Sequence, residues 1–144
     1  MKVIDGDAHF IEPLDMFTRY VDPAYRDRAM RVETDSISGD KKFLVDGKPM
    51  QIFDVEAFLG AVVGYGQKEQ GHDLGSFDRY HYYSAEWEDM GQRIKYLDDE
   101  KIESQVIYPT LGLFWEGEVH DPKLADAHCR AYNTWTFEIC AAHK

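Results

Sequence analysis

The fold of this 144-residue chain is decided by the stretch Val3-Ile4-Asp5-Gly6-Asp7-Ala8-His9-Phe10. The stretch begins apolar and then places polar side chains on alternate positions, at Asp5, Asp7 and His9. Alternation with a period of two is typical of a short β-strand. The dipeptide Glu12-Pro13 should end this strand, because proline suits the first turn of a following helix.

After Trp87 the sequence predicts a helix, a strand and a second helix. The strand covers residues 104–108, which are mostly apolar and are followed by a proline. Asp121-Pro122 combines an N-cap residue with proline at the first helical position, and apolar residues then recur every three or four positions over residues 123–142. Strand, helix, strand, helix is the order typical of a parallel α/β fold.

Between the first strand and Trp87 the pattern is less regular. Short helices are expected over residues 14–20 and 24–29, followed by an insertion over about residues 30–86. Within the insertion, Asp46-Gly47 predicts a β-hairpin, because this pair adopts the positive φ angles of a tight turn. Five glycines between residues 60 and 75 predict loops rather than a second core.

Composition excludes several classes of partner. The formal net charge is −11, which repels phosphate backbones and anionic lipids, so neither nucleic acid nor a membrane surface is expected as a partner. The sequence has no apolar signal-peptide region and no span long enough to cross a bilayer. Cys129 and Cys140 lie about 16 Å apart on one predicted helix, too far for a disulfide. We expect both to be buried in a reducing compartment, the cytoplasm.

Asp7 and His9 are the sharpest local feature of the sequence. Two residues apart on a strand, their side chains point the same way, so a carboxylate oxygen and an imidazole nitrogen would converge from one rigid element. Such a pair suits zinc, manganese or iron. Taken alone, a structural pair that binds no metal explains the same spacing.

Three blocks of sequence resemble one family, in the same order along the chain. The first is residues 3–13, including Glu12-Pro13; the second is residues 93–110, and the third is residues 130–135. They resemble the amidohydrolase-related branch that includes aminocarboxymuconate semialdehyde decarboxylase and its relatives. In that branch the first barrel strand ends in His-x-His, Glu-x-His or Asp-x-His, and Asp7 and His9 match the paired positions.

The resemblance implies a divalent-metal site, with zinc expected first and manganese or iron as alternatives. It also implies an α/β fold, the N-terminal part of a (β/α)8 TIM barrel with a loop and hairpin insertion after the first strand. The family takes further ligands from a middle and the last strand, and none of His120, His128 and His143 matches them. A full barrel needs about 250 residues. Residues 1–144 are therefore expected to be an incomplete single domain that is inactive alone.

Several other residues have two interpretations. Phe114 and Trp115 follow the second strand, where barrel loops contact substrate, but they could equally pack as a lid. Glu12 could orient the ring of His9 by accepting a hydrogen bond from it, although an acidic residue that simply lies in a strand-to-helix turn is the plainer account. Aromatic residues of the last helix should pack the core or the barrel: Tyr132, Trp135 and Phe137.

Two functions from different classes fit the sequence. The first is a metal-dependent enzyme acting on a small carboxylic acid or carbonyl substrate, either a decarboxylase (carbon–carbon lyase) or a hydrolase. No catalytic base can be assigned from the residues present. The second is a non-catalytic partner-binding module or inactive fragment. In that case the aromatic insertion, including His72 and residues 79–83, would form contacts with a partner subunit such as a second copy.

Overall fold

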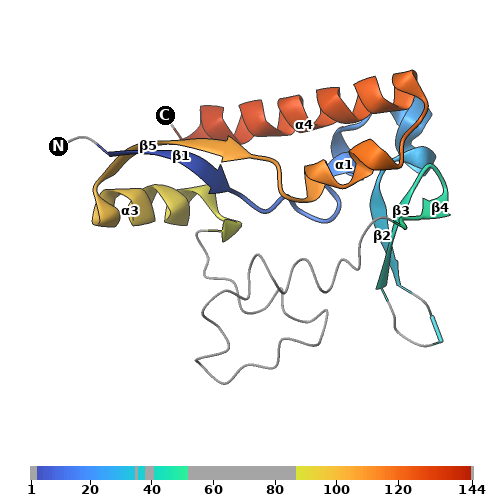
Figure 1. Ribbon diagram of the computed structural model, residues 1–144, viewed down its shortest axis with the longest axis horizontal. Helices are drawn as coiled ribbons and strands as arrows, with labels where there is room; N and C mark the ends of the chain where they lie inside the picture. The colour runs from blue at the N-terminus through green and yellow to red at the C-terminus, as the bar shows by residue number, and fades with distance from the viewer. Residues whose placement is uncertain (1–2, 35, 38–40, 52–86, 144) are drawn as a thin grey trace.

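A computed structural model describes residues 3–34, 36–37, 41–51 and 87–143. Its elements follow one another along the chain as β1 (Val3–His9), α1 (Met16–Tyr20), the 3-10 helix η1 (Pro23–Arg28), β2 (Arg31–Thr34), β3 (Lys41–Val45), β4 (Lys48–Pro49), α3 (Met90–Glu100), β5 (Ile102–Tyr108), the 3-10 turns η5 (Leu111–Leu113) and η6 (Trp115–Gly117), and α4 (Pro122–Ala142). Figure 1 shows the long helix α4 and the shorter α3 alongside the pair β1 and β5, with β2, β3 and β4 grouped at the far end.

Strands β1 and β5 form a parallel two-stranded sheet. The register begins with Val3 opposite Ile102 and ends with His9 opposite Tyr108, so the carboxyl ends of both strands meet at one edge. The predicted order of strand, helix, strand and helix is confirmed, and the described chain is a mixed α/β structure. One face of β5 is exposed, with Val106 49% accessible, because the described residues provide nothing to cover it.

The second sheet is antiparallel, in the order β2-β3-β4. Its hairpin turn has Asp46 at φ 52° and Gly47 at φ 74°, the positive angles that the Asp-Gly pair predicted. Strand β2 was not predicted, because four residues without clear alternation carry little local signal. Residues 31–34, 41–45 and 48–49 of the expected insertion therefore form a small sheet, whereas residues 52–86, including His72 and residues 79–83, lie outside the described part.

Helix α4 holds the core together. Asp121 caps its first turn by accepting a hydrogen bond from the backbone N–H of Lys123 at 2.9 Å, and Pro122 occupies the first helical position, as predicted. The helix buries a single face, formed by Leu124, Ala127, His128, Ala131 and Trp135. This face packs against α1 and the loops after β1 and β5, and the buried cluster also includes Phe10, Met16, Phe17, Leu111, Phe114 and Trp115.

The opposite face of α4 corrects the expectation for the two cysteines. Cys129 and Cys140 are free and exposed rather than buried. Eleven residues bring them to nearly the same side of the helix, and that side lies away from the packed stripe. Phe137 is 73% exposed for the same reason, whereas Trp135 is 5% exposed and belongs to the core as expected. In the part of the chain that the structure describes, no helix combines the length and apolar character needed to cross a membrane.

Candidate functional site

The candidate site lies where β1 and β5 end side by side. In parallel α/β proteins, the carboxyl ends of the strands and the loops that follow them are the usual place for a binding site. His9 is the last residue of β1, and Pro109 and Thr110 directly follow β5. These residues are 100 positions apart in sequence, so only the parallel pairing brings them together.

The ring of His9 is held through one nitrogen. Nδ1 lies 3.1 Å from the carbonyl oxygen of Pro109 and 3.3 Å from the hydroxyl oxygen of Thr110. A carbonyl oxygen can only accept, so Nδ1 carries the proton in this arrangement. The lone pair of a neutral ring is then on Nε2. This is the tautomer that a metal-binding histidine with its other nitrogen tied to the backbone adopts.

Asp7 is exposed, and β1 is irregular beside it. The register advances three residues from Asp5 to Ala8 while β5 advances two, from Gln105 to Ile107. One additional residue in β1 is a β-bulge, a feature that often redirects a side chain near an active site. The simple alternation that placed Asp5, Asp7 and His9 on one face is therefore interrupted, and the metal role of Asp7 stays a prediction.

Glu12 is almost completely buried, with 1% of its surface exposed. Its carboxylate accepts hydrogen bonds from three consecutive backbone N–H groups in the loop after β5: Thr110, Leu111 and Gly112. Burial raises the pKa of Glu12 above its ordinary value, and the three backbone donors oppose that rise by stabilising the charged form. Glu12 does not bond to the His9 ring itself, so it is an acid that joins the two loops.

A series of hydrogen bonds connects helix α3 to strands β1 and β5. Arg93, 5% exposed, donates to the carbonyl oxygen of His9 at 3.0 Å and to the side-chain oxygen of Gln105 at 2.8 Å. Gln105 in turn donates to Asp5 at 2.8 Å. Neither Arg93 nor Thr110 was singled out in the sequence, because a lone arginine on an amphipathic helix and a threonine after a strand are common and carry no local signal.

Phe114 and Trp115 are buried, at 3% and 7% exposed. Trp115 stacks on the ring of His128 with centroids 4.9 Å apart and planes 28° apart. Of the two roles that the sequence left open, packing is the one that these contacts favour. A role of the pair in binding substrate stays a prediction.

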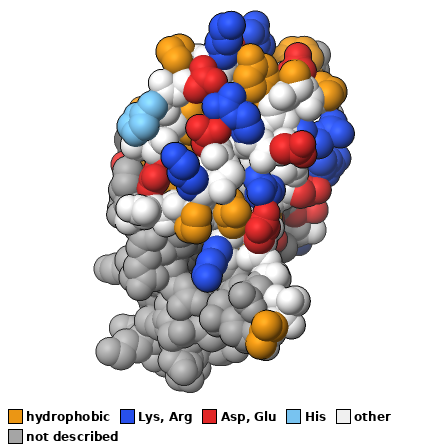
Figure 2. All heavy atoms as spheres, turned by 90° about the vertical axis from the view of Figure 1, so that its right-hand side faces the viewer, with side chains coloured by type: hydrophobic (Ala, Val, Ile, Leu, Met, Phe, Trp, Pro, Cys, Tyr) orange, Lys and Arg blue, Asp and Glu red, His pale blue; other side chains and the backbone are white. Residues whose placement is uncertain are grey.

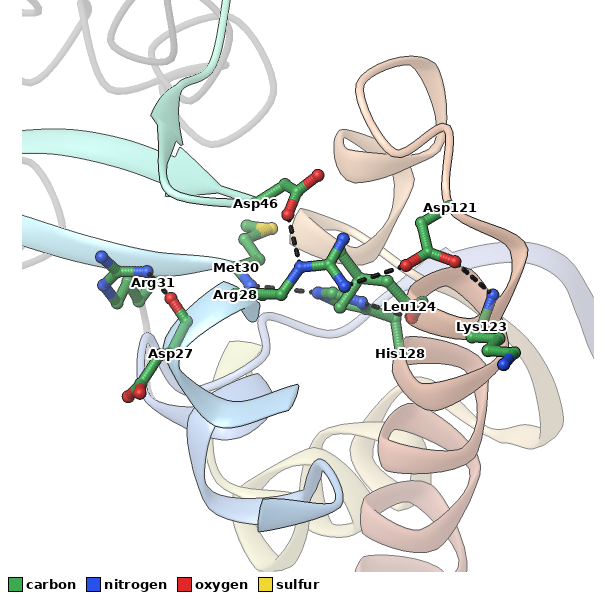
Figure 3. A network of polar contacts seen from close by, with 9 residues as sticks. All are labelled: Asp27, Arg28, Met30, Arg31, Asp46, Asp121, Lys123, Leu124 and His128. Carbon is green, nitrogen blue, oxygen red and sulfur yellow. Dashed lines mark hydrogen bonds and ion pairs between the residues drawn. The ribbon is translucent and has the colours of Figure 1, made fainter. Parts of the chain in front are cut away.

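His128 is the other histidine with a defined environment. Its Nδ1 lies 2.9 Å from the carbonyl oxygen of Leu124, and its Nε2 accepts from the backbone N–H of Met30 at 3.0 Å (Figure 3). Both ring nitrogens are therefore used, and the ring is 0% exposed. Burial lowers the pKa of His128, so the neutral ring is favoured.

Beside His128, Arg28 joins the hairpin to the start of α4. Its guanidinium contacts Asp46 at 2.6 Å and Asp121 at 2.9 Å (Figure 3). These hydrogen bonds raise the pKa of Arg28 and lower the pKa of both carboxyls. The ions are partly exposed. Acidic and basic side chains are interspersed on the face of the molecule that Figure 2 shows. Arg28 therefore forms two surface ion pairs, one with Asp46 and one with Asp121.

Among residues 3–34, 36–37, 41–51 and 87–143, no group of three or more His, Cys, Asp or Glu side chains is placed to hold a metal ion. A catalytic zinc site usually has three protein ligands and one open position. The described residues could therefore contribute part of a metal site, at His9 and Asp7.

This chain is similar to a known protein in its structure. Family models and the sequences of curated proteins give no match. A solved structure, the crystal structure of an amidohydrolase from Mycobacterium avium subsp. paratuberculosis K-10, matches with a TM-score of 0.71 and 26% sequence identity. The match covers 96% of this chain and 38% of that one.

This likeness supports the amidohydrolase superfamily for the chain, and its α/β elements are consistent with a fragment of an amidohydrolase barrel. The chain spans well under half the length of the amidohydrolase that it matches. The class of protein that fold and comparison together support is thus the amidohydrolase superfamily, of which this chain resembles a fragment.

Proposed function

We propose that this chain is part of a metal-dependent enzyme of the amidohydrolase superfamily, in which His9 and Asp7 contribute ligands to one divalent ion. The observation that carries the proposal is the ring of His9. Its Nδ1 is engaged by Pro109 and Thr110, which leaves Nε2 as the available ligand atom at the carboxyl end of β1. Similarity to a solved amidohydrolase supports the enzyme class.

The donor chemistry of the two residues fits such an ion. Imidazole nitrogen and carboxylate oxygen suit zinc, with manganese or iron as alternatives. Two ligands give weak binding, so residues outside the described part would complete the coordination. When bound, the metal would polarise a substrate oxygen or lower the pKa of a water molecule.

The reaction class is either hydrolysis or decarboxylation of a small carboxylic acid or carbonyl compound. The printed name of the structural neighbour, amidohydrolase, favours hydrolysis. The resemblance of residues 3–13 to the decarboxylase-containing branch favours a carbon–carbon lyase. Turnover of carboxylic acids, esters and lactones by the full-length protein, followed by release of CO₂ against release of an alcohol or acid, distinguishes the two.

The proposal also assigns the enzyme to the cytoplasm. Cys129 and Cys140 are free thiols, exposed on α4. Free exposed thiols are compatible with a compartment that keeps them reduced. The expected partner is a small-molecule substrate, with contacts to a second copy of the chain as a further expectation.

Metal analysis of the full-length protein tests the proposal. His9→Ala should remove bound metal and activity while the fold survives, since the core lies elsewhere. Asp7→Asn should weaken binding without abolishing it, because an amide oxygen still coordinates but carries no charge. His120→Ala, a change at a histidine that is exposed and away from the end of β1, is the control and should keep full metal content. Unchanged metal stoichiometry in His9→Ala would show that the histidine is structural.

A further inference from the structure

The buried carboxylate of Glu12 and the loop after β5 fit one another closely. Oε1 accepts from the backbone N–H of Thr110 at 3.0 Å and of Gly112 at 3.2 Å, and Oε2 accepts from Leu111 at 2.8 Å. A carboxylate this deeply buried is tolerated only when its oxygens are hydrogen-bonded. Both oxygens are used, and all three donors come from one short segment.

Gly112 shows how little space this contact leaves. A Cβ atom at Gly112 would lie 3.0 Å from Cβ of Pro109 and 3.2 Å from Oε1 of Glu12. Those separations are shorter than ordinary van der Waals contact, so a side chain at Gly112 would push the carboxylate and the loop apart. The loop is therefore shaped to receive the Glu12 carboxylate.

The segment that Glu12 holds is the same one that holds His9. The hydroxyl of Thr110 donates its only hydrogen to the carbonyl oxygen of Phe10 at 3.1 Å. Its oxygen can then only accept, and the partner within reach is Nδ1 of His9 at 3.3 Å. Together with the carbonyl oxygen of Pro109, this arrangement presents two acceptors to Nδ1 and no donor.

We propose that Glu12 and Thr110 are positioning residues for His9. Glu12 holds the backbone of residues 110–112, so that Pro109 and Thr110 keep the proton of His9 on Nδ1 and leave the lone pair on Nε2. The consequence for metal binding rests on the proposed function. The tautomer of the ring does not, because it is a property of the metal-free protein.

If the role of Glu12 were purely structural, its replacement would lower the stability of the protein without changing the tautomer of His9. In Glu12→Gln the amide nitrogen cannot accept, so at least one of the three backbone donors loses its partner and the loop moves away from His9. Thr110→Val removes the hydroxyl at nearly constant volume, whereas Thr110→Ser retains it and serves as the matched control.

The tautomer of His9 is measured in the metal-free full-length protein by nitrogen-15 NMR at a pH where the ring is neutral, with histidine labelled and His9 assigned from His9→Ala. Wild type and Thr110→Ser should have the proton on Nδ1. Glu12→Gln and Thr110→Val should show a mixture that includes Nε2–H, with the smaller fraction in Thr110→Val because the carbonyl oxygen of Pro109 still accepts from Nδ1. If Glu12→Gln does not fold, the comparison of Thr110→Val with Thr110→Ser tests the proposal. An unchanged tautomer in a folded Glu12→Gln or Thr110→Val variant would overturn the proposal.

Zinc titration of the same variants separates this inference from the proposed function. Loss of a group that orients a metal-binding histidine typically lowers metal affinity by about 10–100-fold. Glu12→Gln and Thr110→Val should weaken zinc binding by that factor, and Thr110→Ser should not. If the wild type binds none of zinc, manganese and iron, the proposed function fails, while a tautomer change in the variants would still support the positioning role.

Discussion

Two histidines in this chain occupy opposite kinds of environment. His128 sits on α4 inside the core, where its ring contacts the ring of Phe17 and stacks on Trp115. Each of its nitrogens has a backbone partner, at Leu124 and Met30. His9 lies half-buried at the end of the β1–β5 sheet, and the described hydrogen bonds of its ring involve Nδ1 alone.

The difference shows how a structural histidine is distinguished from a candidate ligand. His128 is buried and both of its ring nitrogens are hydrogen-bonded, so no atom of the ring is available to bind a ligand. Its contribution is therefore to stability. Engagement through Nδ1 leaves His9 rigid but with Nε2 available. Residue type and sequence position do not distinguish the two histidines. The hydrogen-bond partners of their ring nitrogens do.

Replacing His128 should have the largest effect on stability. His128→Ala removes two buried hydrogen bonds, leaves the N–H of Met30 without its partner and opens a cavity between Phe17 and Trp115. Together these changes should lower the free energy of unfolding by about 3–5 kcal/mol. Urea denaturation of His128→Ala beside wild type measures the loss. A variant as stable as wild type would contradict a structural role for this ring.

The comparison also predicts a pH dependence. Burial lowers the pKa of His128 below its ordinary 6.5, so the unfolded chain takes up a proton more readily than the folded one. The stability that the neutral ring provides is complete above pH 6.5 and is lost as the pH falls below it toward the lowered folded value.

Melting temperatures on either side of pH 6.5 provide the measurement. His128→Gln offers a neutral side chain whose oxygen can accept from Met30, so it is the matched variant without a titrating group. We expect the melting temperature of wild type to fall more steeply than that of His128→Gln as the pH drops through this window. Parallel curves would show that another group controls acid stability.

His9→Ala should have a much smaller effect on stability than His128→Ala, although it should abolish metal binding. The change removes a partly buried contact of Nδ1 with Pro109 and Thr110. A single hydrogen bond of this kind contributes about 1 kcal/mol. Denaturation of the metal-free protein measures the difference, and a loss as large as that in His128→Ala would break the distinction between the two histidines.

The smallest effect should come from the ion pairs of Arg28. Arg28→Gln removes contacts with Asp46 and Asp121, but side-chain exposures of 39%, 35% and 32% mean that water and salt already screen these charges. The difference in melting temperature from wild type should be slight at low salt and should shrink further as salt is added. A difference that is independent of salt would indicate that the packing of the Arg28 side chain matters more than its charge.

Local physical chemistry made some features of this protein predictable. The turn at Asp46-Gly47 follows from two residues that tolerate positive φ. The start of α4 at Pro122 follows from its Asp121 cap, and the face it buries follows from apolar spacing. Each of these outcomes depends on interactions within a few residues, which the order of amino acids alone contains.

Other features depend on contacts between distant parts of the chain. The sequence did not show that Glu12 receives the backbone of residues 110–112, or that Arg93 reaches the carbonyl of His9, because each contact crosses 80 to 100 positions. It also misplaced Cys129 and Cys140, because they were expected to be buried on residue type, whereas both lie on the side of α4 away from its apolar stripe.

The sequence by itself determined the α/β pattern, the ends of α4, the hairpin turn and the choice of Asp7 and His9 as candidate ligands. Only the tertiary structure decided which nitrogen of His9 is engaged and that both nitrogens of His128 are. The physical reason is that a hydrogen-bond partner is defined by position in space. Parallel pairing of β1 with β5 brings Pro109 and Thr110 to His9, and packing of α4 brings His128 to Met30.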